Sequence, residues 1–272
     1  MRHYGDYDYV PTDKQMEIMD LVYKFRFINR KQIQTIFNYK DPKSVNPLLK
    51  DLVEHNYLGR IYSHKLLENT KPAIYYLANA GIGWIRANYC DEKPEKVKRF
   101  YQDKHASERF INHCIAVCDL AIQWKGSRKK MFSSDDFYFC TSTELWYNED
   151  LKTILPDAHI EICEGETYLA SLLNLIDSYV PMYAIRYKID QYINLRSNSN
   201  DAWDMYTGSD IETLIIRLIF PNQIKQRRMS KYIKEQLYRS FDTQNLTFLL
   251  TTHKKALEEG VEADIWETIK DA

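Results

Sequence analysis

Residues 12–77 carry the pattern that most constrains the fold: three short amphipathic helices, each with its own start signal, followed by a hairpin. The first helix opens with Thr12 and Gln15, which are spaced as a capping box. Its apolar residues then recur at i, i+3, i+4 and i+7, the spacing of a helix that buries one face. This apolar stripe consists of Ile18, Leu21, Val22 and Phe25.

The second helix has a similar start signal. Asn29 is the expected N-cap, Gln32 occupies the third position of a capping box, and Ile28 can pack against Ile33 across the cap. The residues expected to face inward are Ile33, Ile36 and Phe37.

The third helix has two possible starts. Either Asp41 caps it with Pro42 at the first helical position, or Asn46 and Pro47 take these roles. Both alternatives predict the same buried face, made of Val45, Leu48, Leu49, Leu52 and Val53. Both also leave the same side chains pointing away from the core, namely Lys43, Ser44, Asn46, Lys50 and Glu54.

Two segments rich in aromatic and β-branched residues, 57–65 and 73–77, flank a turn-prone stretch at 68–72. Three helices followed by such a hairpin resemble a winged helix-turn-helix, which implies double-stranded DNA as the partner and the third helix as the recognition helix. Residues 24–65 hold nine Lys and Arg against three Asp and Glu, an excess of six in a chain of net charge −1. This local excess suits phosphate contacts. The predicted DNA-binding residues are Lys31, Lys43, Ser44, Asn46, Lys50, Arg60, His64, Lys65 and Lys71.

Length and composition predict two domains in a globular chain, because 272 residues with 44% hydrophobic content can build more than one core. We expect a DNA-binding domain at 1–90 and an α/β domain at 105–272. Residues 91–104 between them, with a charge run and Pro94, are expected to form a solvated linker or an exposed helix. No run of about 18 apolar residues occurs, which predicts a cytoplasmic protein without a membrane partner.

The five cysteines are irregularly spaced, as expected for reduced thiols and not for a disulfide framework. His113, Cys114 and Cys118 are residue types that often bind metals and lie close together in the sequence. Both cysteines, however, fall on the buried face of a helix expected at 105–124. Free cysteine is among the most buried residue types, so we assign this cluster to the core. The sequence predicts no metal and no cofactor there.

The pattern of the second half predicts mixed α/β structure. The expected fold class is therefore a winged helix-turn-helix followed by an α/β domain with a central mixed sheet. Residues 154–162 alternate as a strand, with Ala158 and Ile160 on one face and Asp157, His159 and Glu161 on the other. Further strands are expected at 168–176, 211–220 and 246–250, and helices at 182–195, 223–240 and 256–260. Residues 111–272 carry eighteen basic against twenty-four acidic residues, so we expect this half to add little non-specific DNA affinity.

Several short motifs, taken in order, resemble the replication-relaxation family of plasmids and integrative elements. They are residues 72–77 (PAIYYL) with Gly81, His105 at the head of a helix, 155–158 (LPDA), Ile176 with Asp177, Lys188 and Ile189 with Tyr192, and 248–252 (FLLTT) with Trp266.

The resemblance implies a metal-binding core like that of restriction-type nucleases, in which clustered carboxylates hold Mg²⁺ and a lysine positions water. The remnant candidates here are Asp157, Asp177 and Lys188, but Leu175 occupies the glutamate position of the expected Glu-x-Asp motif. Glu161 or Glu166 could substitute from a neighbouring position. The alternatives are structural: a strand-end aspartate that caps a turn, and a solvated lysine on a helix. We favour these and commit no catalytic residue.

Three functional hypotheses follow. The first is a sequence-specific DNA-binding protein of a plasmid, phage or integrative element, acting as a homodimeric transcriptional regulator or as an accessory factor for replication or transfer. The second is a metal-dependent DNA nicking enzyme, the only one that needs Mg²⁺. The third is a docking module whose acidic second half binds a partner protein while the winged helix serves dimerisation.

Overall fold

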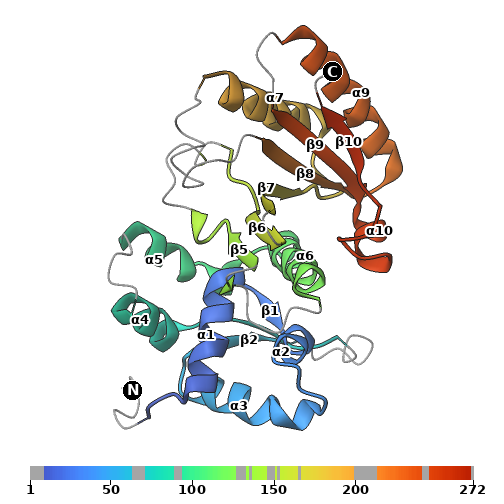
Figure 1. Cartoon of the computed structure of the whole chain (residues 1–272). Helices are drawn as coiled ribbons and strands as arrows, with labels where there is room; N and C mark the ends of the chain where they lie inside the picture. The colour runs from blue at the N-terminus through green and yellow to red at the C-terminus, as the bar shows by residue number, and fades with distance from the viewer. Residues whose placement is uncertain are drawn as a thin grey trace. The chain divides into compact units, whose positions relative to one another are not determined.

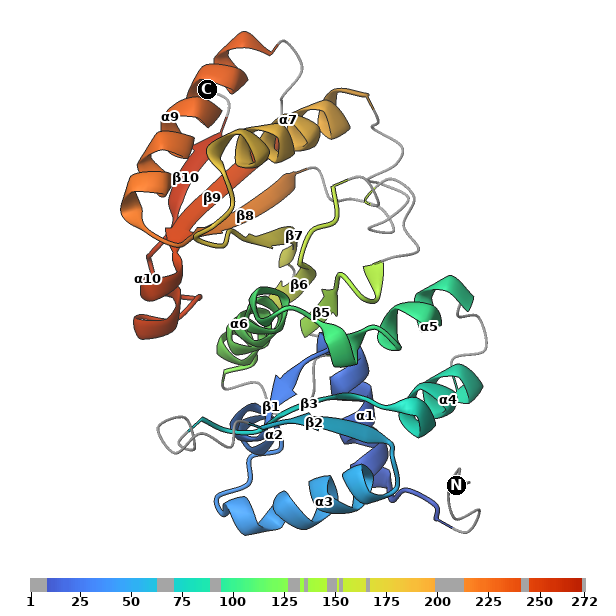
Figure 2. The ribbon, with the colours of Figure 1, turned by 180° about the vertical axis from the view of Figure 1, so that it is seen from behind.

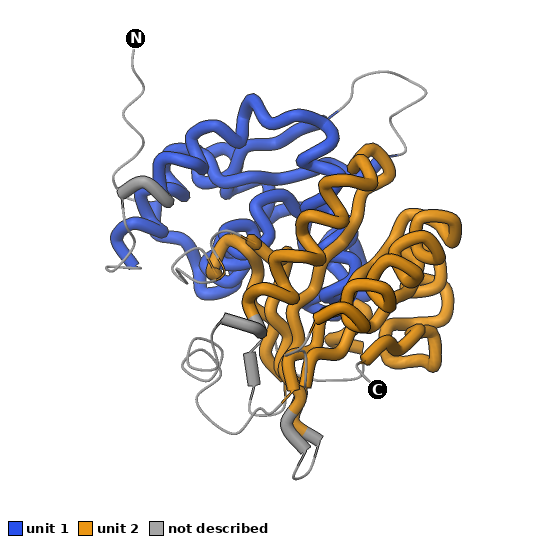
Figure 3. The backbone as a smooth tube through the Cα atoms, turned by 90° about the horizontal axis from the view of Figure 1, so that it is seen from above, with its two compact units in different colours: residues 1–122 blue, residues 123–272 orange. Residues whose placement is uncertain are grey.

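The computed structural model describes residues 9–62, 71–88, 94–126, 133–134, 137–145, 151, 154–164, 167–198, 213–240 and 245–270. It is a mixed helix and sheet structure, which confirms the predicted fold class. The chain forms two compact units, residues 1–122 and 123–272, shown separately coloured in Figure 3. The predicted linker at 91–104 falls within unit 1 by this division, and the assignment of functional domains stays a prediction. No helix among the described residues is long and apolar enough to cross a membrane.

Unit 1 places its helices around a three-stranded antiparallel sheet of order β1-β3-β2 (Figure 1). The short strand β1 was not predicted, because two residues carry no readable alternation. The elements are α1 (Asp13–Phe25), β1 (Ile28–Asn29), α2 (Arg30–Ile36), η1 (Pro42–Ser44), α3 (Asn46–Glu54), β2 (Leu58–Ile61), β3 (Ile74–Leu77), α4 (Asn79–Asn88), α5 (Pro94–Phe100), η2 (Asp103–His105) and α6 (Glu108–Lys125), whose last residues belong to unit 2.

The predicted capping boxes are present. The Thr12 backbone N–H donates to Gln15 Oε1 at 2.9 Å, and the Asn29 N–H donates to Gln32 Oε1 at 2.9 Å while Asn29 Oδ1 accepts from the Gln32 N–H at 3.0 Å. These bonds satisfy backbone donors that the first helical turn leaves without partners. Helices α1 and α2 therefore begin where the sequence indicates.

Both proposed starts of the third helix are used. Asp41 Oδ1 accepts from the Lys43 N–H at 2.8 Å and caps the 3₁₀ turn η1, whereas α3 itself begins at Asn46 with Pro47 in its first turn. Pro47 costs no hydrogen bond there, because the first N–H groups of a helix have no intrahelical acceptor.

The two strands of the predicted hairpin are confirmed. Strands β2 and β3 pair antiparallel, with Leu58 opposite Leu77 and Ile61 opposite Ile74. Residues 63–70, which include the predicted DNA contacts His64 and Lys65, lie outside the described residues.

The last part of unit 1 is tied to α1 by a buried ion pair. The Arg26 guanidinium contacts the carboxylate of Asp103, which is 1% exposed, and lies 4.6 Å from the ring centroid of Phe110. Burial raises the pKa of Asp103, and the hydrogen bond from Arg26 opposes that shift. Removal of either partner would leave a charge in the core, so this pair holds η2 against the end of α1.

Unit 2 is built on a seven-stranded sheet of order β10-β9-β8-β7-β6-β5-β4, in which β7, β8 and β9 are parallel and the other neighbours antiparallel. The strand predictions for 154–162, 168–176, 211–220 and 246–250 correspond to β6, β7, β8 and β9. Its elements are β4 (Ser133–Ser134), β5 (Phe137–Thr141), β6 (Ala158–Glu164), β7 (Thr167–Leu175), α7 (Met182–Asn198), β8 (Leu214–Phe220), α9 (Gln223–Arg239), β9 (Leu246–Thr252), α10 (His253–Glu258) and β10 (Glu267–Lys270).

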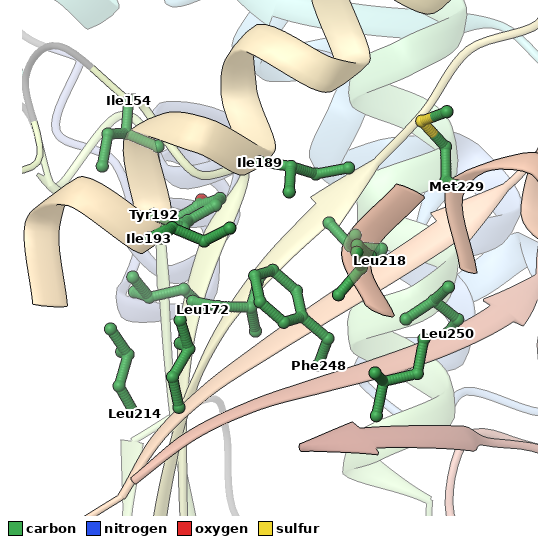
Figure 4. Close-up of a cluster of buried hydrophobic side chains, with 14 of the residues drawn as sticks. Ile154, Leu172, Ile189, Tyr192, Ile193, Leu214, Leu218, Met229, Phe248 and Leu250 are labelled. Atoms are coloured by element: carbon green, nitrogen blue, oxygen red, sulfur yellow. The ribbon is translucent and has the colours of Figure 1, made fainter. Parts of the chain in front are cut away.

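Helices α7 and α9 cover one face of this sheet (Figures 1 and 2). Figure 4 shows Ile189 and Tyr192 of α7 above Leu172, Leu218 and Phe248 of the strands. His159 is 1% exposed on β6, where its strand partners are Cys140 and Leu172, and burial lowers its pKa to about 4. The alternation predicted for this strand is therefore correct, but His159 on its polar side is buried, whereas Glu161 is half-buried.

Two tryptophans stack beside the middle of the sheet. The rings of Trp124 and Trp266 lie 6.4 Å apart, and the Arg217 guanidinium is 5.0 Å from the centroid of Trp266. Arg217 Nε also donates to Ser171 Oγ at 2.9 Å. Burial lowers the pKa of this arginine to about 10. Cation–π contacts and a hydroxyl acceptor thus offset part of the cost of burying its charge.

The two glycines of α4 provide a test of the packing in unit 1. A Cβ at Gly81 would lie 2.2 Å from the Tyr57 carbonyl oxygen, whereas a Cβ at Gly83 would meet nothing within 4 Å. We expect Gly81→Ala to lower the free energy of unfolding by about 2 kcal/mol or more, because a backbone atom must move. Gly83→Ala is the matched control and is expected to raise it by up to about 1 kcal/mol through helix propensity. Urea unfolding measures both, and equal effects of the two variants would contradict the close approach of α4 to Tyr57.

Candidate functional site

The predicted contact side chains of η1 and α3 share one exposed surface. Lys43, Ser44, Asn46 and Lys50 are all exposed, while Val45, Leu49 and Leu52 on the opposite side are buried. Asn46 and Lys50 are one helical turn apart and therefore lie on the same side of α3. Figure 2 shows α3 at the border of unit 1, with α1 and β2 on its inner side. We call the exposed side chains of Lys43, Ser44, Asn46 and Lys50 the α3 face.

The α3 face carries positive charge that is only lightly engaged within the protein. Lys50 Nζ lies 3.6 Å from Glu54 Oε1, with the two side chains 71% and 56% exposed. An exposed pair one turn apart contributes little to stability and is screened by salt. Its lysine can therefore exchange this partner for a phosphate at small cost.

The remaining predicted contacts lie on neighbouring elements. Lys31 is exposed in the first turn of α2, and Arg60 and Lys71 are exposed at the end of the hairpin where β2 stops and β3 begins. The Arg60 guanidinium lies 5.9 Å from the ring centroid of Tyr62, which is also exposed and was not predicted as a contact. The sequence signal for Tyr62 was its position in the predicted hairpin next to basic residues.

A side chain that the sequence indicated only as a cap also anchors α2 to the end of unit 1. Gln32 Nε2 donates to the Ile115 carbonyl oxygen at 2.8 Å and to Asp119 Oδ1 at 2.7 Å. Gln32 thus fixes the start of α2 and joins it to α6, two elements far apart in sequence. No local pattern could have predicted this second role.

In unit 2 the structure brings together Asp157 and Lys188, two of the three residues that the resemblance suggested as candidates. Asp157 Oδ2 accepts from the Leu175 backbone N–H at 2.6 Å, and Lys188 Nζ donates to the Leu155 carbonyl oxygen at 3.1 Å. Burial lowers the pKa of Lys188, and the nearby Asp157 carboxylate opposes that shift. The Asp157 carboxylate thus joins the start of β6 to the end of β7, whereas the structural alternative in the sequence had it cap a turn.

The other carboxylates named from the sequence are placed differently. Asp177 Oδ2 accepts from the Tyr179 hydroxyl at 2.9 Å, two residues beyond the end of β7. Glu161 lies four residues along the strand from Asp157, about 13 Å at 3.3 Å per residue, which is too far to share one cation. Its Oε1 lies 3.4 Å from His159 Nδ1. Leu175 is buried, and its backbone contacts Asp157.

The remaining candidates from the sequence are Glu166 and the cysteines of the helix expected at 105–124. Glu166 lies outside the described residues. Cys114 and Cys118 are buried on α6, and burial raises the pKa of the Cys118 thiol, as expected for core cysteines. Among the residues that the structure describes, no group of three or more His, Cys, Asp or Glu is arranged to hold a metal ion.

A capped three-helix segment with a hairpin, followed by an α/β unit with a mixed sheet, defines a two-unit protein whose candidate sites lie one in each unit. The chain belongs to the replication-relaxation family, which it matches over residues 19–210. This match spans the α3 face, Asp157, Asp177 and Lys188. No curated protein and no solved structure matches the chain.

The bond between Asp157 and Leu175 leads to a stability prediction. We expect Asp157→Ala to lower the free energy of unfolding by about 1–3 kcal/mol, because a partly buried N–H at the end of β7 loses its acceptor. Asp177→Ala removes a hydrogen bond at the surface and is expected to change it by less than about 1 kcal/mol. Urea unfolding followed by tryptophan fluorescence compares the two. Equal losses would show that the Asp157 carboxylate has no special structural role.

Proposed function

We propose that unit 1 is a winged helix-turn-helix that binds double-stranded DNA through the α3 face, and that the protein acts at a defined DNA site of a mobile element. The observation that carries the proposal is the clustering of Lys43, Ser44, Asn46 and Lys50 on the exposed side of η1 and α3. An α-helix fits the major groove, where lysine and asparagine side chains can reach base edges and phosphates. Lys31, Arg60 and Lys71 add charge on flanking elements.

Two features favour DNA over a docking role for this surface. No large hydrophobic side chain of residues 42–54 is exposed, whereas stable protein interfaces have an apolar core. Its charge is also opposite in sign to that of residues 111–272, so the excess of basic residues is local. Phosphate contacts require such a concentration of charge.

The family suggests a role in replication or relaxation of mobile elements. Within that role we propose a transcriptional regulator, or an accessory factor for replication or transfer, that binds its site as a homodimer. Two-fold symmetric sites are read by symmetric dimers, which place two recognition helices one turn of DNA apart. A partner protein bound by unit 2 is compatible with this role.

The proximity of Asp157 and Lys188 favours a second candidate function, metal-dependent DNA nicking. Its difficulty is that the described carboxylates do not converge on Asp157, and the glutamate position of the motif is Leu175. One metal held by a single carboxylate would be weakly bound. DNA binding without cleavage is therefore the leading proposal.

The direct test is a salt titration of the full chain on duplexes tiled across DNA around its own coding region. We expect Lys43→Ala/Lys50→Ala to raise Kd at least tenfold. The double variant should also make the fall of log K with log salt less steep by about 1.8, or 0.9 for each lost phosphate contact. The matched control is Lys98→Ala/Lys104→Ala, which removes two exposed lysines elsewhere in unit 1 and should leave Kd within about twofold.

Two results would contradict the proposal. One is equal weakening by the two double variants, since this would mean that only net charge matters. The other is cleavage of supercoiled DNA in Mg²⁺ or Mn²⁺ that Lys188→Ala abolishes, since this would make the second candidate correct.

A further inference from the structure

The outer layer of unit 2 presents tyrosines that the fold does not need. Tyr183 and Tyr187 on α7 are 76% and 65% exposed, and Tyr238 on α9 is 92% exposed. Large aromatic side chains at this exposure contribute almost nothing to the core. Three such side chains on two adjacent helices call for another explanation.

The same layer carries concentrated positive charge. Helix α9 has six Lys and Arg against one Glu, although residues 111–272 have an excess of acidic residues. Met229, Ile233 and Leu237 face the sheet and are buried, which turns Arg228 and Lys231 outward. Helical periodicity thus places Arg228 and Lys231 on the solvent side of α9, where Lys231 Nζ lies 3.8 Å from Glu235 Oε1 in an exposed pair that costs little to exchange for a phosphate.

Contacts between α7 and α9 hold the helix that carries Tyr183 and Tyr187 beside the basic helix. The Tyr232 hydroxyl donates to Asp190 Oδ1 at 2.8 Å, and the Arg186 guanidinium lies 5.1 Å from the Tyr232 ring centroid. Lys225 Nζ donates to the Ser178 carbonyl oxygen at 2.8 Å, just before α7 begins. The two helices lie side by side on one face of the sheet (Figures 1 and 2).

We propose that this layer is a second nucleic-acid site, which binds single-stranded DNA. We call it the α7–α9 face; its residues are Tyr183, Arg186, Tyr187, Arg228, Lys231 and Tyr238. Bases stack on the tyrosine rings, and the basic side chains of α9 contact the phosphates. Sites for single strands combine these two features, because every base has a face that can stack on an aromatic ring.

The spacing of the tyrosines fits a single strand. Tyr183 and Tyr187 are one helical turn apart, about 6 Å along the axis of α7, so an extended strand can place successive bases on the two rings. In a duplex the faces of the bases are stacked inside the double helix, so no base face is exposed to a tyrosine ring. The charge complements phosphate, and the tyrosines distinguish single strands from duplexes.

This site lies in unit 2, whereas the α3 face lies in unit 1. A protein with both sites could hold a duplex site with unit 1 and a separated strand with unit 2. The earlier expectation that the second half adds little DNA affinity rested on its total charge, which conceals the concentration on α9.

The test is fluorescence anisotropy of the full chain with a labelled 20-nucleotide oligo(dT) and with a mixed-sequence single strand. We expect Tyr183→Ala/Tyr187→Ala to weaken binding at least tenfold and Tyr183→Phe/Tyr187→Phe to stay within about twofold, because phenylalanine keeps the ring. Arg228→Ala/Lys231→Ala should make the fall of log K with log salt less steep by about 1.4, or 0.7 for each lost phosphate contact on a single strand. Lys254→Ala/Lys270→Ala removes two exposed lysines elsewhere in unit 2 and should leave the slope unchanged.

The variants of the two faces separate this inference from the proposed function. Lys43→Ala/Lys50→Ala should keep single-strand binding while losing duplex binding, and Tyr183→Ala/Tyr187→Ala should do the reverse. The inference is overturned if the unmodified chain does not bind single strands, or if the alanine variants of the α7–α9 face bind them as tightly as it does. It is also overturned if these variants change only the oligomeric state measured by light scattering, because the face would then be an interface between two copies.

Discussion

The orientation of the α3 face depends on burial of the opposite side of the same segment. Val45, Leu49 and Leu52 are at most 1% exposed, so η1 and α3 cannot rotate without exposing them to water. Burying three such side chains is worth on the order of 5 kcal/mol or more, which far exceeds any single surface contact. The polar side chains Asn46 and Lys50 therefore project outward as a consequence of core packing. A DNA-binding role needs this pre-organisation, because side chains that reach base edges must keep one register.

Total charge conceals how the protein distributes its basic residues. The chain is nearly neutral at −1, yet both η1–α3 and α9 expose basic side chains on helices whose other side is apolar. In each unit the helix period separates the two kinds of residue. An amphipathic helix can thus pack against the core with one side and present basic side chains to solvent with the other. The proposed duplex site and the inferred single-strand site differ in their aromatic content, which is high only on the α7–α9 face.

Local signals in the sequence predicted much of the fold. Capping boxes at Thr12 and Asn29 placed two helix starts, and the apolar spacing placed α3, α7 and α9. Short strands were missed, because β1 and the edge strand β10 are too brief to show alternation. Strand β5 (Phe137–Thr141) was missed because its residues, buried on both faces of the sheet, do not alternate between apolar and polar.

Predicting the sites was harder than predicting the elements. Exposure of Lys43 and Lys50 followed from helical period alone. The contacts of Gln32 with α6, and the electrostatic interaction of Asp157 with Lys188, join residues 31 or more positions apart. Only the folded chain shows such pairs. The α7–α9 face was hidden for the same reason, since nothing local indicates that α7 lies beside α9.

Hydrogen–deuterium exchange of the full chain, with and without its DNA duplex, tests the central claim most directly. If the α3 face binds the duplex, amide exchange in η1 and α3 should slow when DNA is added, while exchange in the core strands β8 and β9 stays unchanged. Binding without any slowing in residues 42–54 would contradict the account, because the duplex would then contact another surface.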